Sequence, residues 1–126
     1  MLEAGLEATV EERVTEAMTA AALGSGDVPV LGTPAVLALA ERAACAAIEG
    51  RLGEGETSVG SSVELAHVAP TPVGATVTVR ARLTGTEGRK LAFSFSVSDG
   101  SGEVARGTHS RVIVKREDFL RAARDR

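Results

Sequence analysis

The sequence predicts an α+β fold in which one antiparallel β-sheet wraps around a single central helix. Three observations support this prediction. A strongly apolar helical segment covers residues 34–49, four stretches of alternating character follow it up to residue 115, and a further candidate strand precedes it at residues 5–15. A chain of 126 residues corresponds to one domain by size, so residues 1–126 are expected to form a single unit.

The first element is the candidate strand at residues 5–15, where apolar and polar side chains alternate loosely. An Ala-rich stretch and a glycine-containing connection follow at residues 16–31. Glycine and proline near the end of this connection favour a flexible loop over a regular element. We therefore expect this segment to lead the chain from the first strand to the helix.

The central helix has clear start and stop signals. Thr33 is a good N-cap, Pro34 suits the first helical position because no N–H donor is needed there, and Gly50 suits the C-terminal stop. Ala, Val, Leu, Ile and Cys occupy all faces between them, which indicates a helix buried all round. Cys45 lies on this helix and is expected to be a small core residue.

Four candidate strands follow the helix, separated by turn-forming residues. They cover residues 57–69, 75–84, 90–98 and 103–115. Tight turns are expected at residues 86–89 and 99–102, Gly107 is expected to mark a bulge, and residues 117–126 should form a short polar helix. In the first of these strands, alternation is expected to place four side chains on one face: Val59, Val63, Leu65 and His67.

Composition argues against several classes of function. The net charge is −3, the basic residues are scattered, and the chain has no Trp or Tyr, so no nucleic-acid partner is expected. No apolar run approaches the ~20 residues of a membrane span, and the N-terminus lacks a basic signal-peptide start. We therefore expect a cytoplasmic protein with no membrane association. One Cys and two distant His residues give no metal-ligand spacing, so neither a metal nor a cofactor is expected.

One charge interrupts the apolar helix. Glu41 lies near its middle, and a carboxylate in such surroundings is costly unless it is paired, hydrated or used in chemistry. Glu41 is thus a candidate catalytic residue. The alternatives are an ion pair with a buried Arg, or exposure on a helix face beside Arg42.

The order of one strand, one apolar helix and four antiparallel strands is that of the hotdog fold. A sheet of this size can curl around one helix and cover it in part. The helix is too apolar for one small sheet to hide completely, so a second subunit is expected to cover the remainder. The sequence therefore predicts a homodimer.

An ordered set of short motifs between about residue 31 and residue 114 resembles the fluoroacetyl-CoA thioesterase branch of the hotdog superfamily. Thr33 and Glu41 stand eight residues apart on the helix, Gly60 follows, and residues 65–74 read LAHVAPTPVG. Further matching pieces lie at residues 76–79, 87–89, 99–100 and 107–111.

This resemblance implies an acyl-CoA thioesterase, with acyl-CoA as its substrate. It implies a catalytic triad of Thr33, Glu41 and His67. It also implies two substrate-binding positions, with the Gly60 backbone N–H near the acyl carbonyl and Arg111 near the site.

Physical chemistry alone, without the resemblance, also indicates possible roles for these residues. Thr33 can be a plain N-cap, although a helix N-terminus also stabilises developing negative charge. Glu41 lies about 12 Å further along the helix axis, which is too far for direct contact with Thr33. His67 is either a hydrogen-bonded core residue or an acid–base group that its strand carries toward Glu41. Arg111 suits a phosphate, a carboxylate or a salt bridge, and His109 is expected to be structural.

Two features of the sequence bear on which acyl group is hydrolysed and on which other functions are possible. The fluoroacetyl-specific enzymes carry aromatic residues in the segment before the helix, whereas residues 21–28 here contain none, so a broader or different acyl group is expected. A non-catalytic protein that binds acyl-CoA or a small ligand on the same scaffold is the alternative function. A hotdog hydratase is the weaker choice, because the sequence has no matching Asp-His motif.

Overall fold

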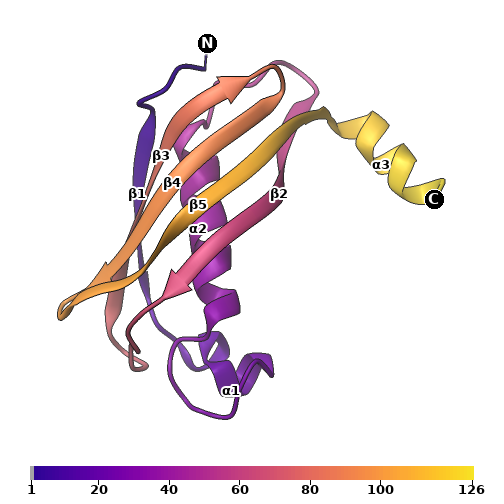
Figure 1. Ribbon diagram of the computed structural model, residues 1–126. Helices are drawn as coiled ribbons and strands as arrows, with labels where there is room; N and C mark the ends of the chain where they lie inside the picture. The colour runs from indigo at the N-terminus through magenta and orange to yellow at the C-terminus, as the bar shows by residue number, and fades with distance from the viewer. Residues whose placement is uncertain (1) are drawn as a thin grey trace.

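A five-stranded antiparallel sheet curls around helix α2 in the computed structural model, which describes residues 2–126 (Figure 1). Residue 1 of the predicted domain lies outside the described residues. The arrangement confirms the hotdog fold. The elements in chain order are β1 (Glu7–Arg13), η1 (Glu16–Met18), α1 (Ala20–Leu23), α2 (Thr33–Ala47), β2 (Glu56–His67), β3 (Thr76–Glu87), β4 (Lys90–Asp99), β5 (Gly102–Lys115) and α3 (Arg116–Arg124).

The core lies between the concave face of the sheet and one side of α2. The strand order is β1-β3-β4-β5-β2, so β1 and β2 form the edges of the sheet. Strict alternation in β3 and β4 sends every second side chain to the helix, as the sequence predicts. These buried residues are Val77, Val79, Ala81, Leu83, Leu91, Phe93, Phe95 and Val97. The residues that α2 buries are Val36, Leu39, Ala40, Ala43, Ala44 and Ala47.

Helix α2 begins one residue earlier than predicted. Gly32 is the N-cap and Thr33 is the first helical residue, so the prediction of Thr33 as N-cap is wrong. A side chain on Gly32 would press against the backbone of Ala20 at 3.0 Å, so this position needs glycine for the close approach of the preceding segment. The Thr33 hydroxyl is consequently free for a contact outside the helix. At the other end, Gly50 adopts φ +76° and turns the chain just after α2.

Within a single chain α2 is buried on one side only, in keeping with the expectation that one small sheet covers the helix in part. The sheet covers one side of the helix and leaves the opposite side open. This open face of α2 consists of Thr33, Pro34, Ala38, Arg42 and Cys45, all of which are exposed. Cys45 is therefore not a core residue within one chain.

A bulge in the edge strand β2 changes which residues face the helix. The pairing of β2 with β5 shifts between Gly60 and Ser62, which inserts one residue and reverses the alternation. Val59 therefore lies on the opposite face from Val63 and His67, contrary to prediction.

Gly107, in contrast, occupies a regular position between its neighbours on β2 and β4. The predicted bulge at this residue is therefore wrong. A Cβ at Gly107 would collide with the Glu64 carbonyl oxygen, so this position needs glycine because the strands pass too closely for a side chain.

The predicted C-terminal helix is present as α3, which projects from the end of β5 away from the sheet (Figure 1). It contains no buried residue. None of the helices within residues 2–126 is long and apolar enough to cross a membrane.

Candidate functional site

The predicted site residues form two groups along α2. Thr33 and His67 meet at the N-terminal end of the helix, while Glu41 and Arg111 meet two turns further on. The groups lie on the side where β2 and β5 pass the helix.

His67 is the last residue of β2, and its imidazole Nδ1 lies 2.9 Å from the Thr33 hydroxyl oxygen. Its other ring nitrogen, Nε2, is buried and has no hydrogen-bond partner among the described residues. A buried polar atom without a partner is costly, so this nitrogen has unused hydrogen-bonding capacity. An imidazole fixed through one nitrogen in this way can exchange a proton through the other.

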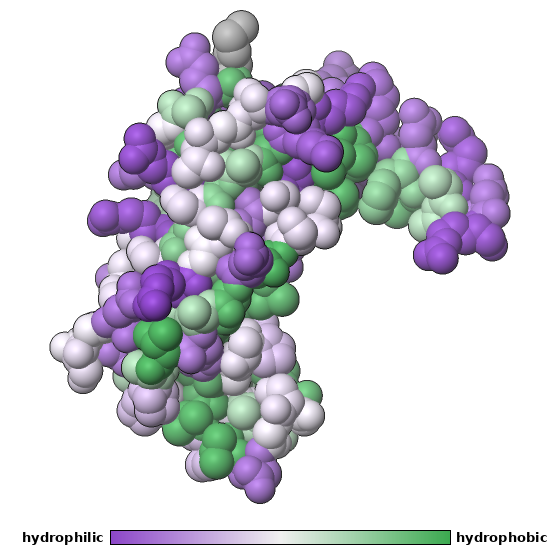
Figure 2. All heavy atoms as spheres, in the orientation of Figure 1, coloured by the Kyte–Doolittle hydropathy of each residue, from purple (hydrophilic) through white to green (hydrophobic). Residues whose placement is uncertain are grey.

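A hollow of about 240 Å³ adjoins His67. Its other lining residues are Val30, Leu31, Val68, Ala69 and Pro70. Four large apolar side chains are exposed in the segments around α1 and the β2–β3 connection: Leu23, Val28, Val68 and Val73. Figure 2 shows apolar surface at the α1 end of the molecule. This end of the site therefore offers aliphatic surroundings beside an imidazole.

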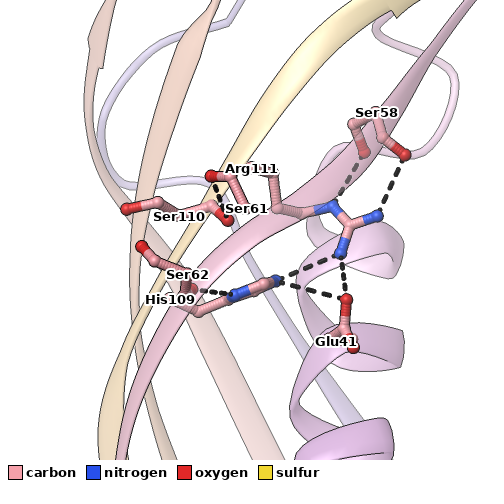
Figure 3. Close-up of polar contacts among 7 residues, drawn as sticks. All are labelled: Glu41, Ser58, Ser61, Ser62, His109, Ser110 and Arg111. Atoms are coloured by element: carbon pink, nitrogen blue, oxygen red, sulfur yellow. Dashed lines mark hydrogen bonds and ion pairs between the residues drawn. The ribbon is translucent and has the colours of Figure 1, made fainter. Parts of the chain in front are cut away.

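Glu41 points from α2 toward β5, where it meets Arg111 (Figure 3). The guanidinium Nη1 of Arg111 donates to Glu41 Oε2 at 3.1 Å. The same guanidinium donates through Nε to the Ser58 hydroxyl at 2.9 Å and through Nη2 to the Ser58 carbonyl at 3.0 Å. Arg111 is only 6% exposed. Glu41 therefore forms an ion pair with a buried Arg, which is one of the alternatives that the sequence left open.

The Glu41 carboxylate nevertheless stays accessible. Its side chain is 39% exposed, against 7% for the Arg111 side chain. Within residues 2–126 its polar contacts use Oε2 alone, so Oε1 has no protein partner. A carboxylate held at one oxygen and open at the other can accept a proton from water or attack an electrophile.

Gly60 lies directly against this carboxylate. A Cβ at position 60 would collide with Glu41 Oε2 and would lie 3.2 Å from His109 Cε1. Because the bulge in β2 follows Gly60, the strand backbone approaches the helix closely here. Glycine is thus required for Glu41 to keep its place, and the backbone of Gly60 lies beside this carboxylate.

Ser58 and His109 also belong to this cluster, although the sequence singled out neither as a candidate site residue. His109 is 2% exposed and lies 3.1 Å from Arg111 Nη1 through its Nε2. The spacing of His109 and Arg111, two apart on one strand, does place them on the same face. Nothing in the sequence indicated that Ser58 would bind the guanidinium.

The expected approach of His67 to Glu41 does not occur within one chain. The middle of β2, at Gly60, passes Glu41, whereas its end, at His67, passes Thr33. β2 runs along α2. Two β2 residues that are seven positions apart therefore contact helix residues that are two turns apart. A single chain therefore presents the candidate groups as two separate halves.

Comparisons with known proteins agree with the resemblance in the sequence. Residues 14–117 match the family model described as "Fluoroacetyl-CoA-specific thioesterase". The fluoroacetyl-CoA thioesterase of Streptantibioticus cattleyicolor is 40% identical over 90 residues, which make up 71% of this chain and 65% of the relative. The match thus spans slightly less than two thirds of that relative.

Solved structures extend the similarity to the whole fold. A structure of the fluoroacetyl-CoA thioesterase is similar to this chain with a TM-score of 0.94 and 32% identity, over 100% of this chain and 98% of that one. A Thermus thermophilus protein described as a thioesterase superfamily member has a TM-score of 0.91 and 31% identity, over 99% and 93% of the two chains. The fold, the two halves of the site and the family match together establish that this chain belongs to the fluoroacetyl-CoA-specific thioesterase family.

Proposed function

We propose that the protein hydrolyses an acyl-CoA thioester to a carboxylic acid and free coenzyme A. The observation that carries this proposal is the accessible carboxylate of Glu41, held at one oxygen by the buried Arg111 beside the backbone of Gly60. Family membership supports the substrate class. Thr33, Glu41 and His67 are the proposed catalytic residues.

The proposed reaction uses the open carboxylate of Glu41 at the thioester carbon. Glu41 either removes a proton from an attacking water or attacks directly to give an anhydride that water then hydrolyses. In both routes the C–S bond breaks and sulfur leaves with the bonding electron pair as a thiolate. His67 donates a proton to that sulfur through Nε2, the nitrogen without a protein partner. The proton that the reacting water releases then replaces it on His67, so that thioester and water give carboxylic acid and thiol. A thiolate is a better leaving group than an alkoxide or an amine, so a thioester needs less acid assistance than an ester or an amide.

The developing oxyanion has two proposed donors. The N-terminus of α2 at Thr33 carries backbone N–H groups that favour negative charge. The Gly60 backbone N–H is the second proposed donor, and the close approach of the strand to Glu41 at this residue supports that role. In this scheme Arg111 acts on substrate through its fixed contact with Glu41, because its guanidinium is already engaged by protein groups.

We further propose that the two halves of the site join across a homodimer. A second copy related by a two-fold axis brings its α2 antiparallel to the first, against the open face of α2. Thr33 and Glu41 both lie four residues from Leu37, so an axis beside Leu37 makes Thr33 of one protomer face Glu41 of the partner subunit. The exposed apolar residues of that face, with Ala38 near its centre, support such packing.

The proposed location is the cytoplasm. With one Cys the chain cannot form an intrachain disulfide, the cross-link that is common in small secreted domains. Detection of the protein only in a soluble cytoplasmic fraction of its source cells would agree with this location, and detection in the medium would contradict it.

A panel of acyl-CoAs tests the proposed function. We expect thiol release from short acyl-CoAs without strong preference for fluoroacetyl-CoA over acetyl-CoA, because the hollow beside His67 and the exposed segments around it carry aliphatic rather than aromatic side chains. Thiol release measured at equal substrate concentrations gives the ratio of the two rates. A ratio in the thousands would contradict the expected selectivity. Binding of acyl-CoA without any turnover across the panel would instead favour the non-catalytic alternative.

Gly60→Ala should lower kcat strongly while the protein remains folded. The new methyl group would collide with Glu41 Oε2 and force the carboxylate away from its position. A displacement of about 1 Å at a reacting group can cost roughly 10²-fold in rate. Thiol-release kinetics and a thermal melt on the same preparation measure both effects.

Gly85→Ala is the matched control for this substitution. Gly85 also lies in a strand at a shift of register, but a Cβ there would meet no atom within 4 Å. Its rate should match that of the wild type. Equal rates for the Gly60 and Gly85 variants would show that the packing of Gly60 against Glu41 has no part in the reaction.

A further inference from the structure

His109 is buried behind the proposed catalytic carboxylate and hydrogen-bonded at both ring nitrogens. Its Nδ1 lies 2.9 Å from the Ser62 carbonyl oxygen, and its Nε2 lies 3.1 Å from Arg111 Nη1. Its ring stacks on Phe93, with centroids 6.1 Å apart and planes 29° from parallel. The imidazole thus touches Arg111, which touches Glu41, in one continuous chain of contacts (Figure 3).

The partners of His109 determine its tautomer. A carbonyl oxygen only accepts hydrogen bonds, so Nδ1 must carry the proton and donate to Ser62. A guanidinium only donates, so Nε2 must be unprotonated and accept from Arg111. The ring is therefore a neutral imidazole with one donor and one acceptor, each in use.

Arg111 depends on this acceptor. Its Nη1 carries two N–H bonds, and its two partners are Glu41 Oε2 and His109 Nε2, both at 3.1 Å. The remaining nitrogens donate to Ser58. Every nitrogen of this nearly buried guanidinium is thus fixed, and loss of the His109 acceptor would leave one buried N–H without a partner.

We propose that His109 is a positioning residue for thioester hydrolysis, acting through Arg111 to hold the Glu41 carboxylate at its reactive place. The inference rests on the proposed function of Glu41. His109 itself lies 3.9 Å from Glu41 Oε2, beyond a hydrogen bond, so its action on the carboxylate passes through the guanidinium. A purely structural role is the competing explanation, in which His109 only ties β5 to the bulged part of β2 through Ser62.

Two amide substitutions separate these roles because each retains one half of the imidazole. In His109→Asn the short amide places its N–H₂ near the position of Nδ1, which retains a donor for Ser62 and removes the acceptor for Arg111. In His109→Gln the longer amide places its oxygen near the position of Nε2, which retains an acceptor for Arg111. A positioning role predicts that the Gln variant keeps activity and the Asn variant loses it. A purely structural role, in which His109 only links β5 to β2 through Ser62, predicts that the Asn variant keeps activity and the Gln variant loses it.

The experiment measures kcat, KM and the melting temperature of both variants and of the wild type. We expect His109→Asn to lose about 100-fold in kcat with little change in KM, since a small displacement of a reacting group has that effect, and His109→Gln to stay within a few-fold of wild type. A ¹⁵N spectrum of the wild type, in which His109 shows the neutral Nδ1–H tautomer, checks the hydrogen-bond assignment without any activity.

The possible outcomes are distinct. A wild-type protein that releases no thiol would overturn the proposed function, and the proposed role for His109 with it. An active wild type with His109→Asn at full kcat, or with His109→Gln as the more impaired variant, would overturn the positioning role alone. A protonated His109 in the ¹⁵N spectrum would also overturn it, because Nε2 would then be unable to accept from Arg111.

Discussion

Replacing Glu41 by Gln is expected to lower the rate of thiol release by roughly 10²–10⁴, the usual cost of losing a positioned base. Gln has nearly the same shape as Glu but accepts no proton and makes a poor nucleophile. Its amide oxygen can still accept from Arg111 Nη1, so a hydrogen bond from the charged guanidinium to a neutral amide replaces the ion pair, at a cost of about 1 kcal/mol. We expect a fall in melting temperature of only about 5 °C.

Glu12→Gln is the matched control for this substitution. Glu12 also pairs with an arginine, Arg42, at 2.7 Å, and its side chain is 37% exposed, close to the 39% of Glu41. The hydrogen bond from Arg42, together with its positive charge, holds the pKa of the Glu12 carboxyl below its ordinary value. Glu12 contacts none of the proposed catalytic residues, but its partner Arg42 lies on the open face of α2, so light scattering first checks that the variant keeps the assembly of the wild type. A variant with unchanged assembly should then match the wild-type rate. Wild-type turnover in Glu41→Gln, whatever its stability, would remove Glu41 from the mechanism.

His67→Asn is expected to lower the rate by a similar factor, roughly 10²–10⁴, through a different loss. The shorter amide retains a polar group near the Nδ1 position, where it can still contact the Thr33 hydroxyl. It has nothing at the Nε2 position, which is the nitrogen proposed to donate a proton to sulfur. Geometry at Thr33 is thus preserved while proton transfer is removed.

The leaving group provides a check on this role. A thioester whose thiol has a low pKa needs less proton assistance, so the loss caused by His67→Asn should shrink for an aryl thioester relative to an acyl-CoA. Thiol release from both substrates by the variant and the wild type gives the comparison. An equal loss on both substrates would contradict proton transfer to sulfur and favour a purely structural His67.

The fold was predictable because its signals are local. Alternation in β3 and β4 and the start signal at Pro34 act over a few residues, and the element order then leaves few arrangements. The burial of α2 was not predictable in the same way. An apolar helix can face a sheet or a partner, and only the curvature of the sheet determines which side stays open. Cys45 falls on that open side for this reason.

The residues of the candidate site could be singled out from the sequence, but their contacts could not. Glu41 stood out because a charge interrupts an apolar helix, and the structure supplies its Arg111 partner from 70 positions further along the chain. The register of β2 against β5 sets that contact, and a bulge with no clear sequence signal sets the register. His109 shares the face of Arg111, yet its two hydrogen bonds emerge only when Ser62 and the guanidinium are both in place.

The central claim is that Thr33 and His67 of one protomer act on the same thioester as Glu41 of the partner subunit. The most direct test is a heterodimer of one Glu41→Gln chain and one His67→Asn chain, isolated through two different affinity tags. Each parent homodimer is expected to be nearly inactive. The heterodimer has one site with every group intact and one site with both groups replaced, so it should show about half of the wild-type rate per dimer. A heterodimer as inactive as its parents would contradict the claim, since Glu41 and His67 would then have to act within the same chain.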